Sequence, residues 1–262
     1  ALRNKVGGLI MAMIYFLGTG SAFPNAKRDN TSLLFSVNGK NILADVSGNP
    51  SRRLKEINKP LHEIDVILLT HMHIDHIYGL PSLLWGMWLE NRTEPLTILV
   101  ECRNKHQLQK WLETIRISEW SIQFDIHIKT FEGCKYEKVM EDEGLQLFTF
   151  PAKHSVPTVG CELVCKDKKI VYSSDTEINS HINEYDYIDI LIHEATFARK
   201  KSTFHSSMEE VLNNYPLKNV DKLIFVHLSE NEPYEEVLNQ FKKIHKEKNS
   251  ILLAYDQMKI TL

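Results

Sequence analysis

The stretch that decides the fold is VILLT at residues 66–70, followed directly by HMHIDH at residues 71–76. Alternation along an extended segment places His71 and His73 on one side, whereas Asp75 and His76 enter the following helix and face elsewhere. Zn²⁺ takes three or four nitrogen, oxygen or sulfur ligands, so four donors that face two directions suit two metal ions better than one. A surface cluster of histidines is the alternative interpretation.

The composition points to a globular chain. It has 262 residues, of which 43% are hydrophobic and 25% charged, and a net charge of −3. These values exclude a disordered, collagen-like or disulfide-stapled chain, and they show no basic excess that would attract nucleic acid. The four cysteines form no CxxC pair, which favours reduced thiols and a cytoplasmic protein. The longest apolar run, residues 9–17, is too short to span a membrane, and we expect neither membrane insertion nor export.

We expect a single domain over residues 1–262, because no linker, repeat or low-complexity tract interrupts the chain. Residues 1–8 (ALRNKVGG) lack periodicity and are expected to form a disordered leader. The mixed order of strands and helices predicts an α/β sandwich. Strands are predicted at 13–17, 32–37, 41–45, 66–70, 96–100, 122–130, 145–150, 160–165, 169–173, 188–192 and 222–226, and helices after Asp75 and at 105–117, 207–215 and 234–246.

Several predicted strands end at residues that bind metals or move protons. Ligand sites in α/β proteins gather at the carboxyl ends of strands, where the backbone is rigid and the next loop is free. Each residue taken alone is equally compatible with a satisfied loop histidine or a turn aspartate. Together with the HMHIDH segment they predict one shared cleft with metal ligands. The strand-end residues are Asp45, His71, His154, Asp175, the His193–Glu194 pair and His227.

The order and spacing of these residues resemble the metallo-β-lactamase fold superfamily. The resemblance implies a four-layer αββα sandwich and two divalent metal ions, with Zn²⁺ expected and Mn²⁺ as the alternative. It also implies that Asp45 does not bind a metal ion itself but holds the metal-binding residues in place. Carried over residue by residue, it implies two ligand sets that share a bridging carboxylate: His71, His73 and His154 for one ion, Asp75, His76 and His227 for the other, and Asp175 between them.

Within that superfamily the sequence is similar to ribonuclease Z, the 3′-processing endonuclease of tRNA precursors. The similarity runs from about residue 14 to residue 227. It rests on FLGTGSAFPNAKRDNTSLLF (16–35), HMHIDHIYGLPSLL (71–84), HEATF (193–197) and HSS (205–207). It implies a proton relay in which Glu194 orients His205 and His205 protonates the leaving oxygen. The alternatives are that Glu194 caps a helix and that His205 belongs to a helix N-terminus.

Two departures from ribonuclease Z concern the substrate. That family carries a long inserted arm between the lone histidine and the lone aspartate, whereas only twenty residues separate His154 from Asp175 here. The final motif, HLSENE at residues 227–232, lacks the arginine that the family places near the phosphate. Lys27 and Arg28 are the candidate phosphate contacts of this chain.

The leading hypothesis is a dinuclear, metal-dependent phosphodiesterase that resembles ribonuclease Z and acts on RNA, including tRNA 3′ ends. Two cations about 3.5–4 Å apart activate a shared water as hydroxide. Asp75 then accepts the remaining proton, and His205 is the general acid. One alternative is a phosphodiesterase of the same fold for a cyclic or short diester, and another is a metal-binding module without turnover. The resemblance also implies a homodimer.

Overall fold

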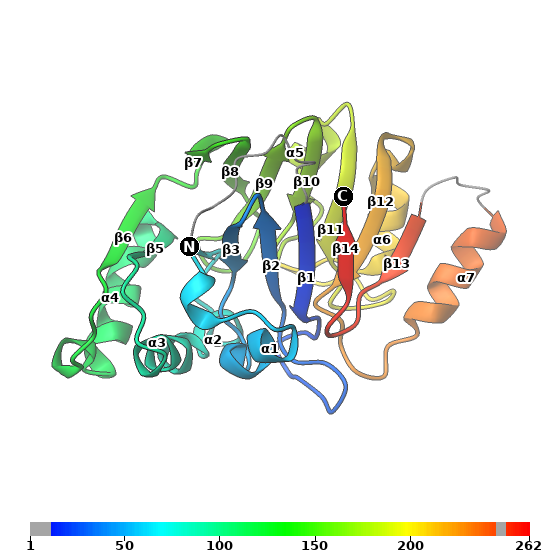
Figure 1. The fold of residues 1–262 in the computed structure, drawn as a ribbon. Coiled ribbons are helices and arrows are strands. Elements are labelled where there is room, and N and C mark those ends of the chain that lie inside the picture. The colour runs from blue at the N-terminus through cyan, green and yellow to red at the C-terminus, as the bar shows by residue number, and fades with distance from the viewer. Residues whose placement is uncertain (1–11, 245–249) are drawn as a thin grey trace.

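Two seven-stranded sheets pack face to face in the computed structural model, which describes residues 12–244 and 250–262 (Figure 1). The predicted leader at residues 1–8 lies outside the described residues. The first sheet has the order β14 (Lys259–Thr261), β1 (Ala12–Gly18), β2 (Ser32–Val37), β3 (Lys40–Ala44), β4 (Val66–Leu69), β5 (Leu96–Glu101) and β6 (Ile126–Phe131). The second has the order β13 (Ser250–Leu253), β12 (Val220–Val226), β11 (Ile188–Glu194), β10 (Lys168–Tyr172), β9 (Val159–Cys165), β8 (Leu145–Pro151) and β7 (Glu137–Asp142).

Helices cover the outer face of each sheet. On the first sheet lie α1 (Pro50–Glu56), α2 (Ile74–Ile77), α3 (Leu80–Leu89) and α4 (Lys105–Thr114), and on the second α5 (Ser180–Asn183), α6 (Met208–Asn214) and α7 (Tyr234–Ile244). Short 3₁₀ turns lie at Leu61–Glu63, Cys102–Asn104, Ile117–Glu119 and Leu217–Asn219. One apolar cluster fills the space between the sheets, and a further cluster lies under each helical layer. The predicted four-layer αββα sandwich is therefore confirmed.

The topology brings several strand ends to one end of the sandwich. Strands β3, β4, β5 and β6 run parallel to one another, as do β10, β11, β12 and β13. Their carboxyl ends lie near the short helix α2, at the lower edge of Figure 1. Both sheets are mixed, and ligand sites in such α/β folds lie at the carboxyl ends of the parallel strands, so we expect the site there.

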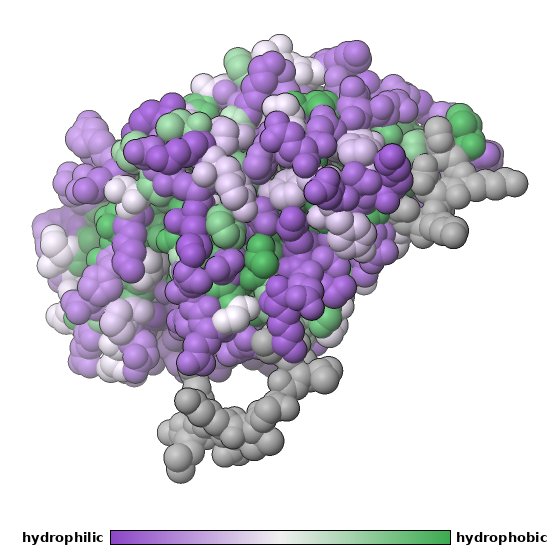
Figure 2. Space-filling model, turned by 90° about the horizontal axis from the view of Figure 1, so that it is seen from above, coloured by the Kyte–Doolittle hydropathy of each residue, from purple (hydrophilic) through white to green (hydrophobic). Residues whose placement is uncertain are grey.

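The opposite end of the sandwich is polar. Seen from above, the surface is mainly hydrophilic, and hydrophobic residues appear only in small patches (Figure 2). Among the described residues, no helix has the length and hydropathy required to cross a membrane.

Candidate metal centre

The seven side chains expected to bind metal converge at the carboxyl ends of the strands. Their ligand atoms form two groups, and within each group all of these atoms lie within 4.8 Å of one another. The grouping matches the two ligand sets expected from the sequence resemblance. One group contains His71, His73 and His154, and the other contains Asp75, His76, Asp175 and His227.

Asp175 lies between the two groups. Its Oδ2 is 3.8 Å from Nε2 of His71, in the first group, and 3.4 Å and 3.3 Å from Nε2 of His76 and His227, in the second. Burial raises the pKa of Asp175, but the charges of His227 and His76 outweigh it and hold the pKa well below its ordinary value. An ionised oxygen within reach of both groups is suited to bridge two cations.

Four buried atoms of these groups have no hydrogen-bond partner among the described residues: Nε2 of His71, His76 and His227, and Oδ1 of Asp175. An unsatisfied buried polar atom costs about 1–3 kcal/mol, so four on adjacent side chains need an explanation. Imidazole nitrogens and carboxylate oxygens are the donors that Zn²⁺ prefers. The residues present therefore fit divalent metal ions.

Asp45 and Thr70 set the orientation of two of these histidines. Asp45 is fully buried, and its Oδ2 lies 2.8 Å from Nδ1 of His76. The hydroxyl of Thr70 donates to the same oxygen at 2.9 Å and lies 3.0 Å from Nδ1 of His71. Because Nδ1 of both imidazoles is engaged by this pair, Nε2 of each is left for the centre. Asp45 thus lies behind a histidine of the centre, as expected from the sequence resemblance. Thr70 was not predicted from the sequence.

Glu194 and Thr196 form a similar pair on the second sheet. Glu194 Oε2 accepts hydrogen bonds from the amide and the hydroxyl of Thr196, both at 2.9 Å, and the hydroxyl lies 2.9 Å from Nδ1 of His227. Glu194 Oε1 lies 2.9 Å from Nδ1 of His205. Burial lowers the pKa of His205, but the hydrogen bond with Glu194 and the charges of Glu194, Asp175 and Asp75 together outweigh it, so the net pKa is raised above its ordinary value. The structure thus brings His205 and Glu194 together, as expected.

The backbone turns sharply where three of these strands end. Asp45, Ser174 and His227 have φ angles of +63°, +54° and +56°. A residue other than glycine costs about 1–2 kcal/mol in this left-handed region. Such strain persists where surrounding contacts hold it, and it clusters at functional sites.

Other candidate residues have partners outside the two ligand groups. The Arg28 guanidinium donates to Oγ1 of Thr19 at 2.6 Å and to the carbonyl of Ala254, while the Lys27 side chain is exposed. His193 is fully buried, with Nδ1 2.7 Å from the Glu194 carbonyl and Nε2 2.9 Å from the Tyr215 hydroxyl. These contacts give Arg28 and His193 structural roles, and we assign neither of them a substrate contact.

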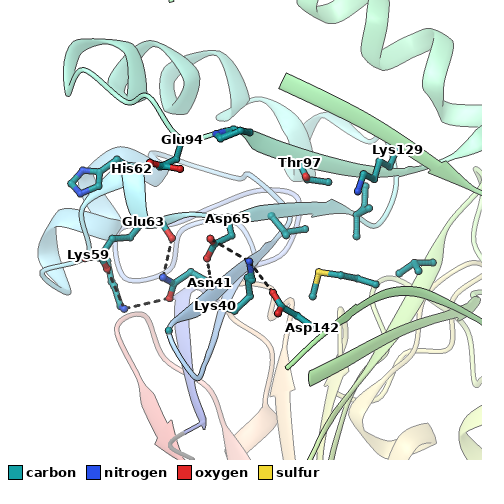
Figure 3. A pocket seen from close by; sticks show the side chains of 16 residues that line it. Lys40, Asn41, Lys59, His62, Glu63, Asp65, Glu94, Thr97, Lys129 and Asp142 are labelled. Atoms are coloured by element: carbon teal, nitrogen blue, oxygen red, sulfur yellow. Dashed lines mark hydrogen bonds and ion pairs between the residues drawn. The ribbon is translucent and has the colours of Figure 1, made fainter. Parts of the chain in front are cut away.

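A cavity of about 800 Å³ lies away from the metal centre, at the amino ends of β4 and β5 (Figure 3). Lys40 projects into it and pairs with Asp65 at 3.5 Å and with Asp142 at 3.0 Å. Lys59 lies 3.3 Å from Oδ1 of Asn41. No member of the two ligand groups lines this cavity, so it is separate from the centre.

Comparison with known proteins gives consistent matches along the chain. The family model described as anti-Pycsar protein Apyc1 matches residues 12–251. The ribonuclease Z of Methanococcus maripaludis (strain C7) is 26% identical over 308 residues, which cover 94% of this chain and 98% of that protein. The ribonuclease Z of Pyrococcus horikoshii is 26% identical over 279 residues, with coverage of 86% and 89%.

Solved structures share the fold. The metallo-beta-lactamase fold protein YhfI from Bacillus subtilis has a TM-score of 0.80 at 17% identity, and the match covers 97% of this chain and 100% of YhfI. The short form of human tRNase Z has a TM-score of 0.76 at 22% identity, with coverage of 95% and 98%. A diphosphatase from the PhnP family has a TM-score of 0.74 at 19% identity, with coverage of 95% and 97%.

Proposed function

The chain belongs to the family of the anti-Pycsar protein Apyc1, and on that premise we propose that it hydrolyses a compact phosphodiester, cyclic or short, with two bound divalent ions. Its ribonuclease Z relatives and its structural neighbours make it a metal-dependent hydrolase of the metallo-β-lactamase fold, in the class of phosphodiesterases and nucleases. The count of two ions, their identity as Zn²⁺ with Mn²⁺ as the alternative, and the substrate are parts of the proposal.

The position of Asp175 is the observation that carries the proposal. A single Oδ2 lies within 3.9 Å of Nε2 of His71 and His154 in one group and of His76 and His227 in the other. We assign Asp175 as the bridging ligand and the two groups as the ligands of one ion each. When bound, such ions supply Lewis-acid activation of a water molecule and of the phosphoryl oxygen.

Asp75 and His205 have complementary roles in this proposal. Burial raises the pKa of Asp75, but the imidazoles of His227 and His76, whose Nε2 atoms lie 3.5 Å and 3.3 Å from its Oδ2, hold the pKa far below its ordinary value, so the carboxylate stays ionised. His205 has a raised pKa, and its Nδ1–H donates a hydrogen bond to Glu194, so the proton on Nε2 is the one delivered to the leaving oxygen. Asp75 is therefore held as an ionised carboxylate, whereas His205 delivers a proton to the leaving oxygen.

Two features support a compact substrate. Strands β9 and β10 are joined by a tight turn at Lys166 and Asp167, where a ribonuclease Z arm would require a long insertion. The alignment with the Methanococcus maripaludis protein spans 308 positions, more than the 262 residues of this chain, so that relative carries segments absent here. The ribonuclease Z relatives favour the 3′ ends of RNA as the second candidate substrate.

Metal removal tests the catalytic proposal. We expect exhaustive chelation to abolish hydrolysis of bis(p-nitrophenyl) phosphate, and we expect Zn²⁺ or Mn²⁺ to restore it, with two ions bound per chain by elemental analysis. Undiminished turnover by protein shown to be free of metal would reject the mechanism. Hydrolysis of precursor tRNA, followed on gels beside a panel of cyclic phosphates, tests the substrate. Cleavage of the tRNA alone would favour the second candidate.

A further inference from the structure

A cavity of about 470 Å³ adjoins the metal centre. The loop between β8 and β9 forms one wall of this cavity. Two lining residues of that loop reach the centre, because His154 belongs to the first ligand group and the Ser155 hydroxyl lies 3.4 Å from Nε2 of His73. Arg103, in the short turn that follows β5, lines the same cavity. A group bound in this cavity would therefore lie between Arg103 and the metal ligands.

A buried carboxylate fixes Arg103 at the cavity. Glu101, the last residue of β5, is fully buried, and it accepts hydrogen bonds from Nε of Arg103 at 2.6 Å and from the Arg103 amide at 2.8 Å. Gly133, with a φ of +65°, makes room for this carboxylate, since a Cβ there would lie 2.4 Å from Cγ of Glu101. The side chain of Asn104 donates to the Pro157 carbonyl at 2.9 Å and so ties the turn to the opposite loop.

The two terminal amino groups of Arg103 are unused. Neither Nη1 nor Nη2 has a hydrogen-bond or ion-pair partner within residues 12–244 and 250–262, and the side chain is 57% exposed. Lys153, on the loop that carries His154, is instead paired with Glu177. A guanidinium binds phosphates and carboxylates through two parallel hydrogen bonds. Arg103 is held through Nε and keeps two nitrogens for such an anion.

We propose that Arg103 binds a second anionic group of the substrate, a phosphate or a carboxylate, which lies in this cavity while the reacting phosphate is at the metal centre. This inference rests on the proposed phosphodiesterase function and narrows its substrates to diesters that carry a further negative charge. It requires neither a base nor a sugar. Arg103 lies outside both ligand groups, so it sets substrate preference and takes no part in the chemical step.

Esters with one leaving group test the second anion. Methyl p-nitrophenyl phosphate has no further charge, whereas a matched series has an alkyl chain of increasing length that ends in a phosphate or in a carboxylate. We expect kcat/KM for the best charged ester to exceed that for the methyl ester by roughly tenfold or more. Arg103→Met should abolish this advantage and leave the methyl ester within about twofold. Arg116→Met, which removes an exposed arginine paired with Glu119 outside the cavity, should change neither.

A double variant separates recognition from folding. Arg103→Met leaves the Glu101 carboxylate buried without its cation, so Glu101→Gln/Arg103→Met is measured beside it, and turnover of the methyl ester reports whether the centre is intact. An advantage that survives in a variant with intact methyl-ester turnover would overturn the inference. A wild-type protein that cleaves the methyl ester with no advantage for any charged ester would also overturn it, while the proposed phosphodiesterase function would stand.

Chemical modification gives a readout that does not depend on turnover. p-Hydroxyphenylglyoxal reacts with exposed guanidinium groups, and peptide mass spectrometry follows each arginine separately. We expect ethylene glycol bisphosphate to slow the modification of Arg103 in the Zn²⁺-loaded protein more than ethyl phosphate does, and to leave Arg116 unchanged. Equal protection by the two compounds, or none, would overturn the inference. If the protein cleaved no ester at all, the proposed function would fail, and with it the assignment of the anion to a substrate.

Discussion

The hydroxyl of Thr196 lies 2.9 Å from Nδ1 of His227 while it donates to Oε2 of Glu194, also at 2.9 Å. A hydroxyl has one proton, so one that donates to a carboxylate must accept from the imidazole. His227 then carries its proton on Nδ1 and presents Nε2 as a lone pair. Thr70 repeats this arrangement between Asp45 and His71 on the other sheet. Two threonines thus set the tautomers of two of the ligands that we propose.

Thr196→Val should weaken divalent metal binding. Valine has a similar volume but no hydroxyl, so Nδ1 of His227 loses its acceptor and the ring loses its fixed tautomer. Loss of such a supporting contact typically costs 10–100-fold in metal affinity. Competition with a chromophoric chelator measures the affinity, and Thr196→Ser, which keeps the hydroxyl, is the matched control. Equal affinity in the valine and wild-type proteins would show that the hydroxyl does not support the ligand.

His205→Ala should slow poor leaving groups much more than good ones. p-Nitrophenolate departs without a proton, whereas an alkoxide needs one from a general acid. We expect a loss of about 10²–10⁴-fold for an alkyl leaving group and a much smaller loss for p-nitrophenolate. His181→Ala provides the control, because His181 is half-buried and contacts Tyr185 away from this centre. An equal loss of rate with both leaving groups would show that His205 is not the general acid.

Strong periodicity made much of the fold predictable. All eleven predicted strands overlap observed ones, and all but β6 are apolar runs that are largely buried in the sandwich. Strand β7 was missed because it is a polar, partly exposed edge strand, EKVMED, and β13 and β14 were missed because they have only four and three residues. Helix α1 was missed because its signals are local, an Asn49 side chain that caps the amide of Arg52 and a proline in the first turn.

The candidate site was predictable to the extent that its residue types are distinctive. Histidines and acidic residues that recur at several strand ends together indicate candidate ligands, whereas a threonine at a strand end gives no such indication. Thr70 and Thr196 are identified only by their partners, which lie on other strands or loops. Arg28 is a residue whose role the sequence alone did not identify. A cation beside a glycine-rich loop suggests a phosphate contact, but in the structure its guanidinium donates hydrogen bonds to Thr19 and Ala254.

Arg28→Met should affect stability more than catalysis. The methionine stem fills similar space, but the carbonyl of Ala254 and the hydroxyl of Thr19 lose their donor. Hydrogen bonds to a charged group contribute about 1.5–3 kcal/mol, so we expect a loss of that order in the free energy of unfolding. Lys27→Met, on the same loop but exposed, should leave stability within about 0.5 kcal/mol. If Arg28→Met instead raised KM strongly and left stability unchanged, Arg28 would be a phosphate contact after all.

His193 should make the fold sensitive to acid. Burial lowers the pKa of His193, and the hydrogen bond to the Glu194 carbonyl offsets this only in part. In the unfolded chain the pKa is about 6.5, so below that pH the unfolded state binds more protons than the folded state. The stabilising contribution of neutral His193 is therefore present above about pH 6.5 and is lost as the pH falls, by up to about 1.4 kcal/mol for each pH unit.

The variant His193→Gln isolates this effect. Glutamine does not titrate but keeps a polar side chain toward Tyr215, so the variant should be less stable than the wild type at about pH 7.5, and the gap should narrow at about pH 5.5. Denaturant unfolding at one fixed free Zn²⁺ concentration measures both proteins. Protonation of the metal ligands is common to the two and cancels in the difference between them. A gap that stays constant across this range would mean that His193 has the same protonation in the folded and unfolded states, and the acid sensitivity would then belong to other groups.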